Sequence, residues 1–204
     1  MPDDFNIKQR VAREAATLLY FGAEKEYKQA KDKAAQTFGI HFLPSNLEVA
    51  LELDKIAEEN EGPKRKERLI QMRKEALAII QLLGGFCPVL IGSVWRGTIK
   101  QGSDIDIAVY GDDPEKIVNV LKVGKVKILK TGWTTVNKRG ITSESFHIYA
   151  ETQAKHGLEI VARSREESGK KRKCETFGDD LKGLNIKELK KILETNPTQQ
   201  FIPS

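Results

Sequence analysis

Apolar positions recur every three to four residues through the first 85 residues, which is the spacing of one helical face. Two early segments end at glycine, a common helix stop: IKQRVAREAATLLYFG and EKEYKQAKDKAAQTFG. In the next segment Ser45 can cap a helix together with Glu48, three residues later. A fourth apolar stripe follows in PKRKERLIQMRKEALAIIQLLGG, which stops at a double glycine. We therefore expect an N-terminal helical region at residues 4–85.

From Cys87 the pattern changes to short apolar or alternating runs, which are typical of strands. The strand candidates are CPVLIGS, DIDIAVY, KVKILKTGW, SESFHIYAE and HGLEIVARS. Between the second and third, DPEKIVNVLK predicts a helix capped by Asp113, with Pro114 at its first position. The order strand, helix, strand, helix and then a meander predicts an α/β or α+β domain with a mixed sheet at residues 86–165.

Residues 166–204 are polar and charge-dense, and within them NIKELKKILETNP predicts one short capped helix. We therefore expect an irregular basic tail. At 204 residues and 39% hydrophobic, the chain can bury one core, or one core and a helical appendage. No run approaches the eighteen or so apolar residues of a membrane span, and the start lacks the features of a signal peptide. These features predict a cytoplasmic protein with no membrane partner.

Charge and cysteine content narrow the classes further. The 34 Lys and Arg residues outnumber 29 acidic residues, for a net charge of +5, which suits a polyanionic partner without identifying one. The only cysteines are Cys87 and Cys174, with no Cys/His cluster, so the sequence supports neither a disulfide framework nor structural zinc. His41, His147 and His156 show no metal-ligand spacing, and we interpret them as structural or surface residues.

The stretch LIGSVWRGTIKQGSDIDIAVYGDD sets two carboxylates one residue apart on a predicted strand. Because side chains alternate along a strand, Asp104 and Asp106 share one face while Ile105 and Ile107 face the core. Two like charges separated by roughly 6–7 Å are costly unless a cation lies between them. Magnesium prefers few carboxylates plus phosphate oxygens, and a pair of ions suits phosphoryl transfer. The sequence thus predicts a site for two Mg²⁺ ions.

Upstream of the carboxylates, the turn GSVWRGT offers groups that bind phosphate. Gly92 lets the backbone approach closely, and Ser93 supplies a hydroxyl. Arg96 and Lys100 lie where they could neutralise phosphate charge, although a surface helix commonly carries such residues. Ser103 could tighten the turn before Asp104 or be a plain loop serine. Gly92, Ser93, Arg96 and Ser103 are therefore the expected nucleotide-binding residues.

Gly92-Ser93, a segment of ten residues and then Asp104-Ile105-Asp106 together resemble the nucleotidyltransferase superfamily related to DNA polymerase beta. The resemblance covers residues 86 to about 163. It extends to archaeal proteins with a nucleotidyltransferase domain and, more distantly, to archaeal CCA-adding enzymes, whose large C-terminal RNA-binding portion has no counterpart in this sequence. It implies transfer of a nucleoside monophosphate from an NTP to an acceptor hydroxyl, with release of pyrophosphate. The phosphate motif does not select the base, and ATP is the expected NTP.

The resemblance also implies a third carboxylate on a later strand, where it completes the metal site. In HGLEIVARS, Leu158 and Ile160 face the core, which puts Glu159 on the opposite face. Glu159 is therefore the expected third metal ligand and catalytic carboxylate, beside Asp104 and Asp106. Family members more often use Asp there, and a solvated strand glutamate is the rival interpretation. Glu144 and Glu151 fit less well because they lie at the ends of their strand.

Basic runs at 64–68 and 163–173 could follow a nucleic-acid backbone, or simply be solvated faces. Three functions stay open. The leading one is an enzyme acting on RNA, such as tRNA. The second is an adenylyltransferase acting on a protein or small molecule, and the third is a non-catalytic nucleotide or nucleic-acid binding module. The helical region could hold the acceptor or form a homodimer surface.

Overall fold

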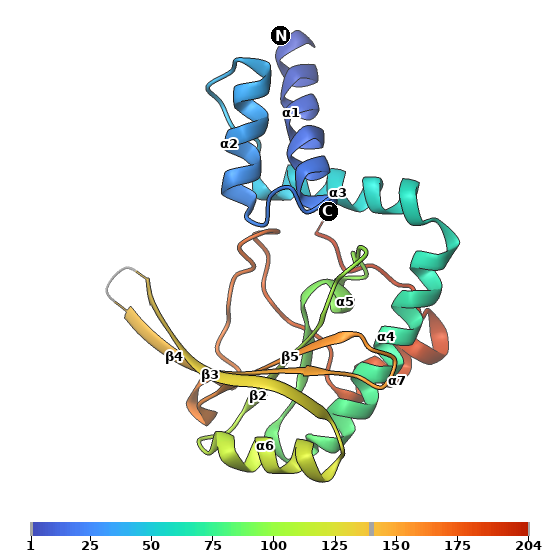
Figure 1. Cartoon of the computed structure of the whole chain (residues 1–204), viewed down its shortest axis with the longest axis vertical. Coiled ribbons are helices and arrows are strands. Elements are labelled where there is room, and N and C mark those ends of the chain that lie inside the picture. Colours follow the sequence, from blue (N-terminus) through green and yellow to red (C-terminus); the bar gives the residue numbers. More distant parts are fainter. Residues whose placement is uncertain (1, 139–140, 204) are drawn as a thin grey trace. The chain divides into compact units, whose positions relative to one another are not determined.

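The computed structural model describes residues 2–138 and 141–203. The chain divides into two compact units (Figure 1). The first comprises residues 1–65, 173–180 and 202–204, and the second comprises residues 66–172 and 181–201. None of the helices in the described part of the chain is long and apolar enough to cross a membrane.

The first unit is built from three helices, α1 (Pro2–Tyr20), α2 (Tyr27–Phe38) and α3 (Asn46–Glu61). The predicted capping box of α3 is confirmed, because Ser45 and Glu48 each accept a hydrogen bond from the other's backbone amide. Small and branched side chains from all three helices form one buried cluster, which includes Val11, Ala15, Ala30, Ala34, Val49 and Ile56. The helical character of the N-terminal region is thus confirmed.

Helix α4 (Pro63–Leu82) begins in the first unit and contributes most of its length to the second. Its apolar stripe is buried in the core of the second unit, through Leu69, Met72, Ala76 and Ile80. The short helix η1 (Gly84–Phe86) follows. The two packing units therefore do not divide at the expected boundary after residue 85.

The second unit contains a sheet of five strands in the described residues: β1 (Val89–Ile91), β2 (Ile105–Tyr110), β3 (Lys127–Lys138), β4 (Ile141–Glu151) and β5 (Gly157–Arg163). The strand order is β1-β2-β5-β4-β3. Strands β2 and β5 are parallel and the other neighbours antiparallel, which confirms a mixed sheet. The expected meander is confirmed, because β3, β4 and β5 are consecutive antiparallel neighbours, and its last strand β5 lies beside β2.

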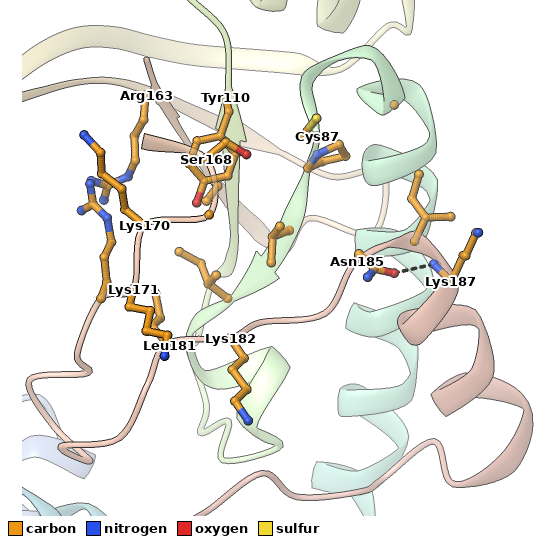
Figure 2. Close-up of a pocket in the computed structure, with 18 residues that line it drawn as sticks. Cys87, Tyr110, Arg163, Ser168, Lys170, Lys171, Leu181, Lys182, Asn185 and Lys187 are labelled. Atoms are coloured by element: carbon orange, nitrogen blue, oxygen red, sulfur yellow. Dashed lines mark hydrogen bonds between the residues drawn. The ribbon is translucent and has the colours of Figure 1, made fainter. Parts of the chain in front are cut away.

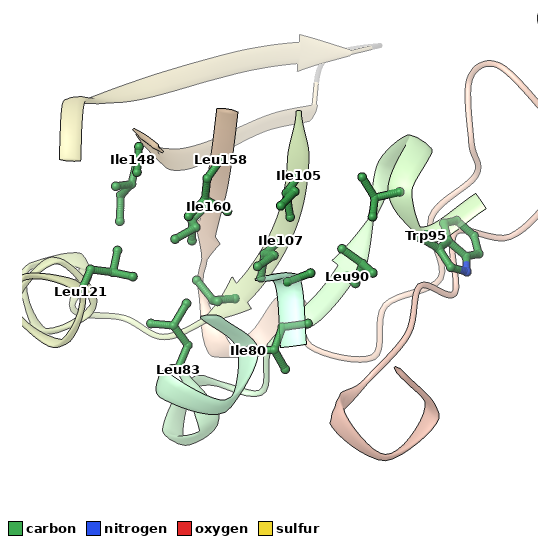
Figure 3. Close-up of a cluster of buried hydrophobic side chains, with 14 of the residues drawn as sticks. Ile80, Leu83, Leu90, Trp95, Ile105, Ile107, Leu121, Ile148, Leu158 and Ile160 are labelled. Atoms are coloured by element: carbon green, nitrogen blue, oxygen red, sulfur yellow. The ribbon is translucent and has the colours of Figure 1, made fainter. Parts of the chain in front are cut away.

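The core of the second unit lies against one face of this sheet (Figure 3). Ile105, Ile107, Ile148 and Ile160 point into it from β2, β4 and β5. Helix α6 (Pro114–Val123), capped by Asp113 as predicted, contributes Ile117 and Leu121 to the same core. Because side chains alternate along each strand, the opposite face of β2 and β5 carries the acidic positions.

The C-terminal segment also packs into the second unit. Leu184 pairs with Leu90 beside β1, and both are buried. Helix η2 (Arg165–Glu167) follows β5. Helix α7 (Ile186–Thr195) begins at a capping box of Asn185 and Glu188, as the predicted capped helix requires, and its Leu189 is fully buried. Part of the tail that was expected to be irregular is therefore integral to the core.

Candidate active site

Two of the predicted carboxylates are neighbours across the parallel pair of strands. Asp106 of β2 stands in register with Glu159 of β5, on the face opposite the isoleucine core. Asp104 comes just before β2, two residues from Asp106, and therefore shares its side of the strand. The structure thus brings Asp104, Asp106 and Glu159 to one region of the sheet.

The turn at Gly92 lies directly against Asp106. Strand β1 ends at Ile91, which is in register with Asp106, and the short helix α5 (Gly92–Arg96) starts at once. Gly92 has φ +71°, and a β-carbon there would lie 2.0 Å from Oδ2 of Asp106. Only glycine fits this backbone conformation and this contact without strain. The Gly-Ser turn and the carboxylates thus form one site.

A second glycine makes a similar contact with Asp104. A β-carbon on Gly157, the first residue of β5, would lie 2.1 Å from Oδ1 of Asp104. Nothing in the sequence around Gly157 signals this contact, because it depends on β5 lying beside β2. The carboxylates of Asp104 and Asp106 are therefore each packed against glycine backbone.

The electrostatics of these carboxylates favour a bound cation. Burial, with the negative charges of Glu159 and then Asp104, raises the pKa of Asp106 from 3.8 to about 7. Burial and the charge of Glu159 also raise the pKa of Asp104. Among the described residues no Lys, Arg or His side chain forms an ion pair with either aspartate. The negative charge at this point is therefore left uncompensated by the protein.

The donor set fits magnesium, because carboxylate oxygens are the ligands that this hard cation prefers. The side chains do not yet converge on one point: in the described part of the chain, no three His, Cys, Asp or Glu side chains are grouped closely enough to hold an ion. The carboxylate of Glu159 is turned toward His147. The carboxylates thus have the chemistry and charge that suit Mg²⁺, and their side chains would have to turn toward one another to hold one.

Glu159 is held by residues of the neighbouring strand β4. Its Oε1 lies 2.7 Å from Nδ1 of His147, and Nε2 of the same ring lies 2.9 Å from Oγ of Ser145. Tyr149 is directly opposite Glu159, and its ring is stacked on that of His147. The sequence interpretation of His147 as a structural or surface residue missed this contact. Alternation along SESFHIYAE is the signal that places these three side chains on one face.

The other predicted nucleotide-binding residues have mixed positions. Ser103 closes the turn before Asp104, since its Oγ accepts a hydrogen bond from the amide of Lys100 at 2.9 Å. Ser93 is half-buried in α5, next to Gly92. Arg96, at the end of α5, is 3% exposed, donates to the carbonyl of Phe201 and lies over Trp95. Arg96 therefore joins α5 to the C-terminal segment.

The two basic runs also differ. In the first unit, Arg65 from the run at 64–68 is buried and forms ion pairs with Asp54 and Glu58. The charge of Arg65 is therefore neutralised by ion pairs within the first unit. In the second unit, Arg163 and residues 170–172 border a cavity on the carboxylate face of the sheet. This run retains the geometry for an anionic partner.

Comparison with solved structures gives weak likenesses. A cytoplasmic RNA terminal U-transferase is 16% identical, with a TM-score of 0.34, covering 57% of this chain and 36% of the other. The Cid1 poly(U) polymerase with MgGTP is 15% identical, with a TM-score of 0.33 and coverages of 56% and 39%. The GLD-2/RNP-8 complex is 11% identical, with a TM-score of 0.34 and coverages of 60% and 39%. The matches thus span less than half the length of those chains.

A search of curated proteins finds no significant match. Nothing in these comparisons supports the narrower resemblance to archaeal CCA-adding enzymes. The family model described as "Nucleotidyltransferase domain" matches residues 88–197, a range that contains the Gly92 turn and all three carboxylates. Because this match covers more than half of the 204 residues, the chain belongs to the nucleotidyltransferase domain family.

Proposed function

We propose that the chain is a metal-dependent nucleotidyltransferase that moves a nucleoside monophosphate from an NTP to an acceptor hydroxyl and releases pyrophosphate. The observation that carries this proposal is the register of Asp106 with Glu159 against the Gly92 turn. A phosphate-binding turn and a carboxylate group with uncompensated charge are the two parts that such a reaction requires.

Each residue has a role in this proposal. Asp104, Asp106 and Glu159 supply oxygen ligands for two Mg²⁺ ions. When bound, these ions lower the pKa of the acceptor hydroxyl and neutralise charge on the triphosphate. Gly92 and Ser93 hold the β- and γ-phosphates through the backbone and a hydroxyl. His147 is a positioning residue, because it hydrogen-bonds to the carboxylate of Glu159.

RNA is the proposed acceptor and ATP the proposed donor. The acceptor assignment is supported by the cationic side chains that border the carboxylate face at Arg163 and residues 170–172. Basic charge near a phosphoryl-transfer site suits a polyanionic acceptor better than a neutral metabolite.

The test is transfer of an α-phosphate label. Purified protein is incubated with Mg²⁺, each labelled NTP in turn, and either total RNA or no added acceptor. Label on RNA, strongest with ATP and absent with EDTA, is the expected result. Label on protein or on a small molecule would show that the acceptor is that molecule and not RNA. No transfer to any acceptor, with Mg²⁺-independent NTP binding that survives in Asp106→Asn, would contradict the enzymatic proposal.

A further inference from the structure

A cavity of about 700 Å³ lies on the carboxylate face of the sheet, within the second unit (Figure 2). Ile91 and Ala108 line it, and each is next to the carboxylates: Ile91 is in register with Asp106, and Ala108 is two residues further along β2. Tyr110 lines the cavity two residues beyond Ala108. The cavity therefore continues from the candidate active site along β2, away from the Gly92 turn.

Six cationic side chains border this cavity: Arg163, Lys170, Lys171, Arg172, Lys182 and Lys187. Figure 2 shows them on three sides, with Arg163 and Lys170 on one, Lys171 and Lys182 on a second, and Lys187 on the third. None of the described residues that line the cavity is acidic, although Arg172 is paired with Glu167 at 2.8 Å. Such a surface attracts an anion with several charges.

The charges belong to side chains and not to a helix end. The first amides of α7, at Lys187 and Glu188, donate to Oδ1 of Asn185, so the helix supplies its own cap. Burial and the nearby charge of Arg172 lower the pKa of Arg163. Two guanidinium groups that repel each other in a partly buried place gain stability when an anion binds between them.

The floor of the cavity is apolar. Val89, Ile91, Ala108 and Leu181 form it, and the ring of Tyr110 lies at one end. An apolar floor surrounded by cations suits a nucleotide. Its base and sugar would lie on the floor, and its phosphates would reach the cationic rim formed by the six side chains named above. The volume is within the range of pockets that bind small ligands.

We propose that this cavity binds the terminal nucleotides of the acceptor RNA strand, with their phosphates on the cationic rim. Along a strand Ala108 lies about 7 Å and Tyr110 about 13 Å from Asp106. A strand end seated there presents its terminal hydroxyl to the carboxylates, while the triphosphate approaches from the Gly92 side. The inference rests on the proposed function for the identity of the acceptor, and its test needs no catalysis.

The test is binding of a labelled single-stranded RNA with a free terminal hydroxyl, in EDTA and without NTP, at several salt concentrations. Lys170 and Lys171 are exposed, and Lys170→Ala with Lys171→Ala removes two charges from the rim. The control pair, Lys116→Ala with Lys122→Ala, removes the same charge from α6 on the opposite face. We expect weaker binding in the rim variant, with a log–log salt slope smaller by about 1.4 for two lost contacts.

A second readout uses Cys87, which is exposed and lines the cavity. In a Cys174→Ser background it is the sole thiol, so the RNA should protect it from alkylation. Equal RNA binding by rim variant and wild type would overturn the proposal. Protection of Cys87 from alkylation by ATP alone in EDTA would also overturn it, because it would indicate a site for free nucleotide. Binding of polyglutamate as tight as binding of RNA would overturn it as well. Rim-dependent RNA binding without any nucleotidyl transfer would leave this inference standing and remove the proposed function.

Discussion

Gly92 and Gly157 each lie where a β-carbon would collide with an aspartate carboxylate, at 2.0 Å from Asp106 and 2.1 Å from Asp104. Any residue larger than glycine at position 92 or 157 would therefore collide with an aspartate carboxylate. Asp106 is also partly buried beside Glu159, so its charge is costly in the absence of a cation. These two properties, close packing and uncompensated charge, can be tested separately.

The packing is tested by Gly92→Ala, compared with Gly102→Ala. Both glycines have left-handed φ, +71° and +79°, but nothing lies within 4 Å of a β-carbon at Gly102. Both variants should lose about 1–2 kcal/mol from the backbone conformation. Gly92→Ala should lose a further ~1–3 kcal/mol from the contact with Asp106 and bind Mg-NTP less well. Chemical unfolding and nucleotide titration check this, and equal losses in the two variants would contradict the contact.

The charge is tested by Asp106→Asn in EDTA. The folded-state pKa, about 7, exceeds the ordinary value of 3.8, so the folded chain binds the proton more tightly than the unfolded chain. The stability contributed by this proton is complete below about pH 4 and is lost as the pH rises to about 7. At about pH 8 the variant should therefore be more stable than wild type, by an amount on the order of 4 kcal/mol.

The difference in the free energy of unfolding between Asp106→Asn and wild type should shrink toward about pH 4, where wild-type Asp106 is protonated. Added Mg²⁺ should stabilise wild type at high pH and leave Asp106→Asn nearly unchanged, because a ligand stabilises the state that binds it. Unfolding free energies at several pH values, with and without Mg²⁺, give the answer. A variant that is less stable than wild type at high pH in EDTA would show that the charge of Asp106 is already compensated.

At the scale of elements, α5 is too short to be stable alone and is fixed by Arg73 of α4. The fully buried guanidinium of Arg73 donates to the carbonyls of Val94 and Trp95 in α5, at 3.1 and 2.9 Å. It also donates to Pro197 and Gln199, at 2.7 and 2.8 Å. Arg73 thus joins the helix that follows the Gly92 turn to the C-terminal segment.

We predict that Arg73→Met lowers the free energy of unfolding by 3 kcal/mol or more, an order-of-magnitude figure for several lost charged hydrogen bonds and orphaned carbonyls. NTP affinity should fall as well, since α5 is displaced. The matched control is Lys74→Met on the next, exposed position of α4. Urea unfolding of both variants checks the prediction, and similar stabilities would show that Arg73 does not hold α5.

Local features of this fold are predictable from local sequence. Ser45 with Glu48, and Asp113 with Pro114, mark helix starts because the capping atoms lie within three residues. The alternation in DIDIAVY likewise places the carboxylates opposite the core. The Gly-Ser and Asp-x-Asp spacing is equally local, and it identified the family that the comparison supports.

Features that depend on strand order are not predictable in this way. The position of β5 between β2 and β4 brings Glu159 to Asp106. Nothing within HGLEIVARS encodes that neighbour, and the expectation for Glu159 came from the family resemblance. The contact of His147 with Glu159 depends on the same pairing. The hydrogen bond from Arg96 to the carbonyl of Phe201 also depends on how the C-terminal segment returns to α5, which the local sequence does not indicate. Sequence reasoning therefore found candidate residues and missed the side chains that hold them.

At the scale of the whole molecule, the two units have separate hydrophobic clusters. No residue belongs to both clusters in the described part of the chain. We therefore predict that a chain of residues 63–204 keeps the folded sheet unit, with cooperative unfolding and buried fluorescence from Trp95, which is 4% exposed. Thermal unfolding followed by fluorescence checks this. Loss of the cooperative transition would show that the helical unit is required for the sheet to fold.

The central claim is that the carboxylates on the open face of the sheet carry out metal-dependent nucleotidyl transfer. The most direct test is the rate of label transfer from NTP in Glu159→Gln, with Glu151→Gln as the matched control at the end of β4. We expect the rate to fall by a factor on the order of 10² or more in Glu159→Gln, the usual cost of removing a positioned catalytic carboxylate, and to stay near wild type in Glu151→Gln. A wild-type rate in Glu159→Gln would contradict it.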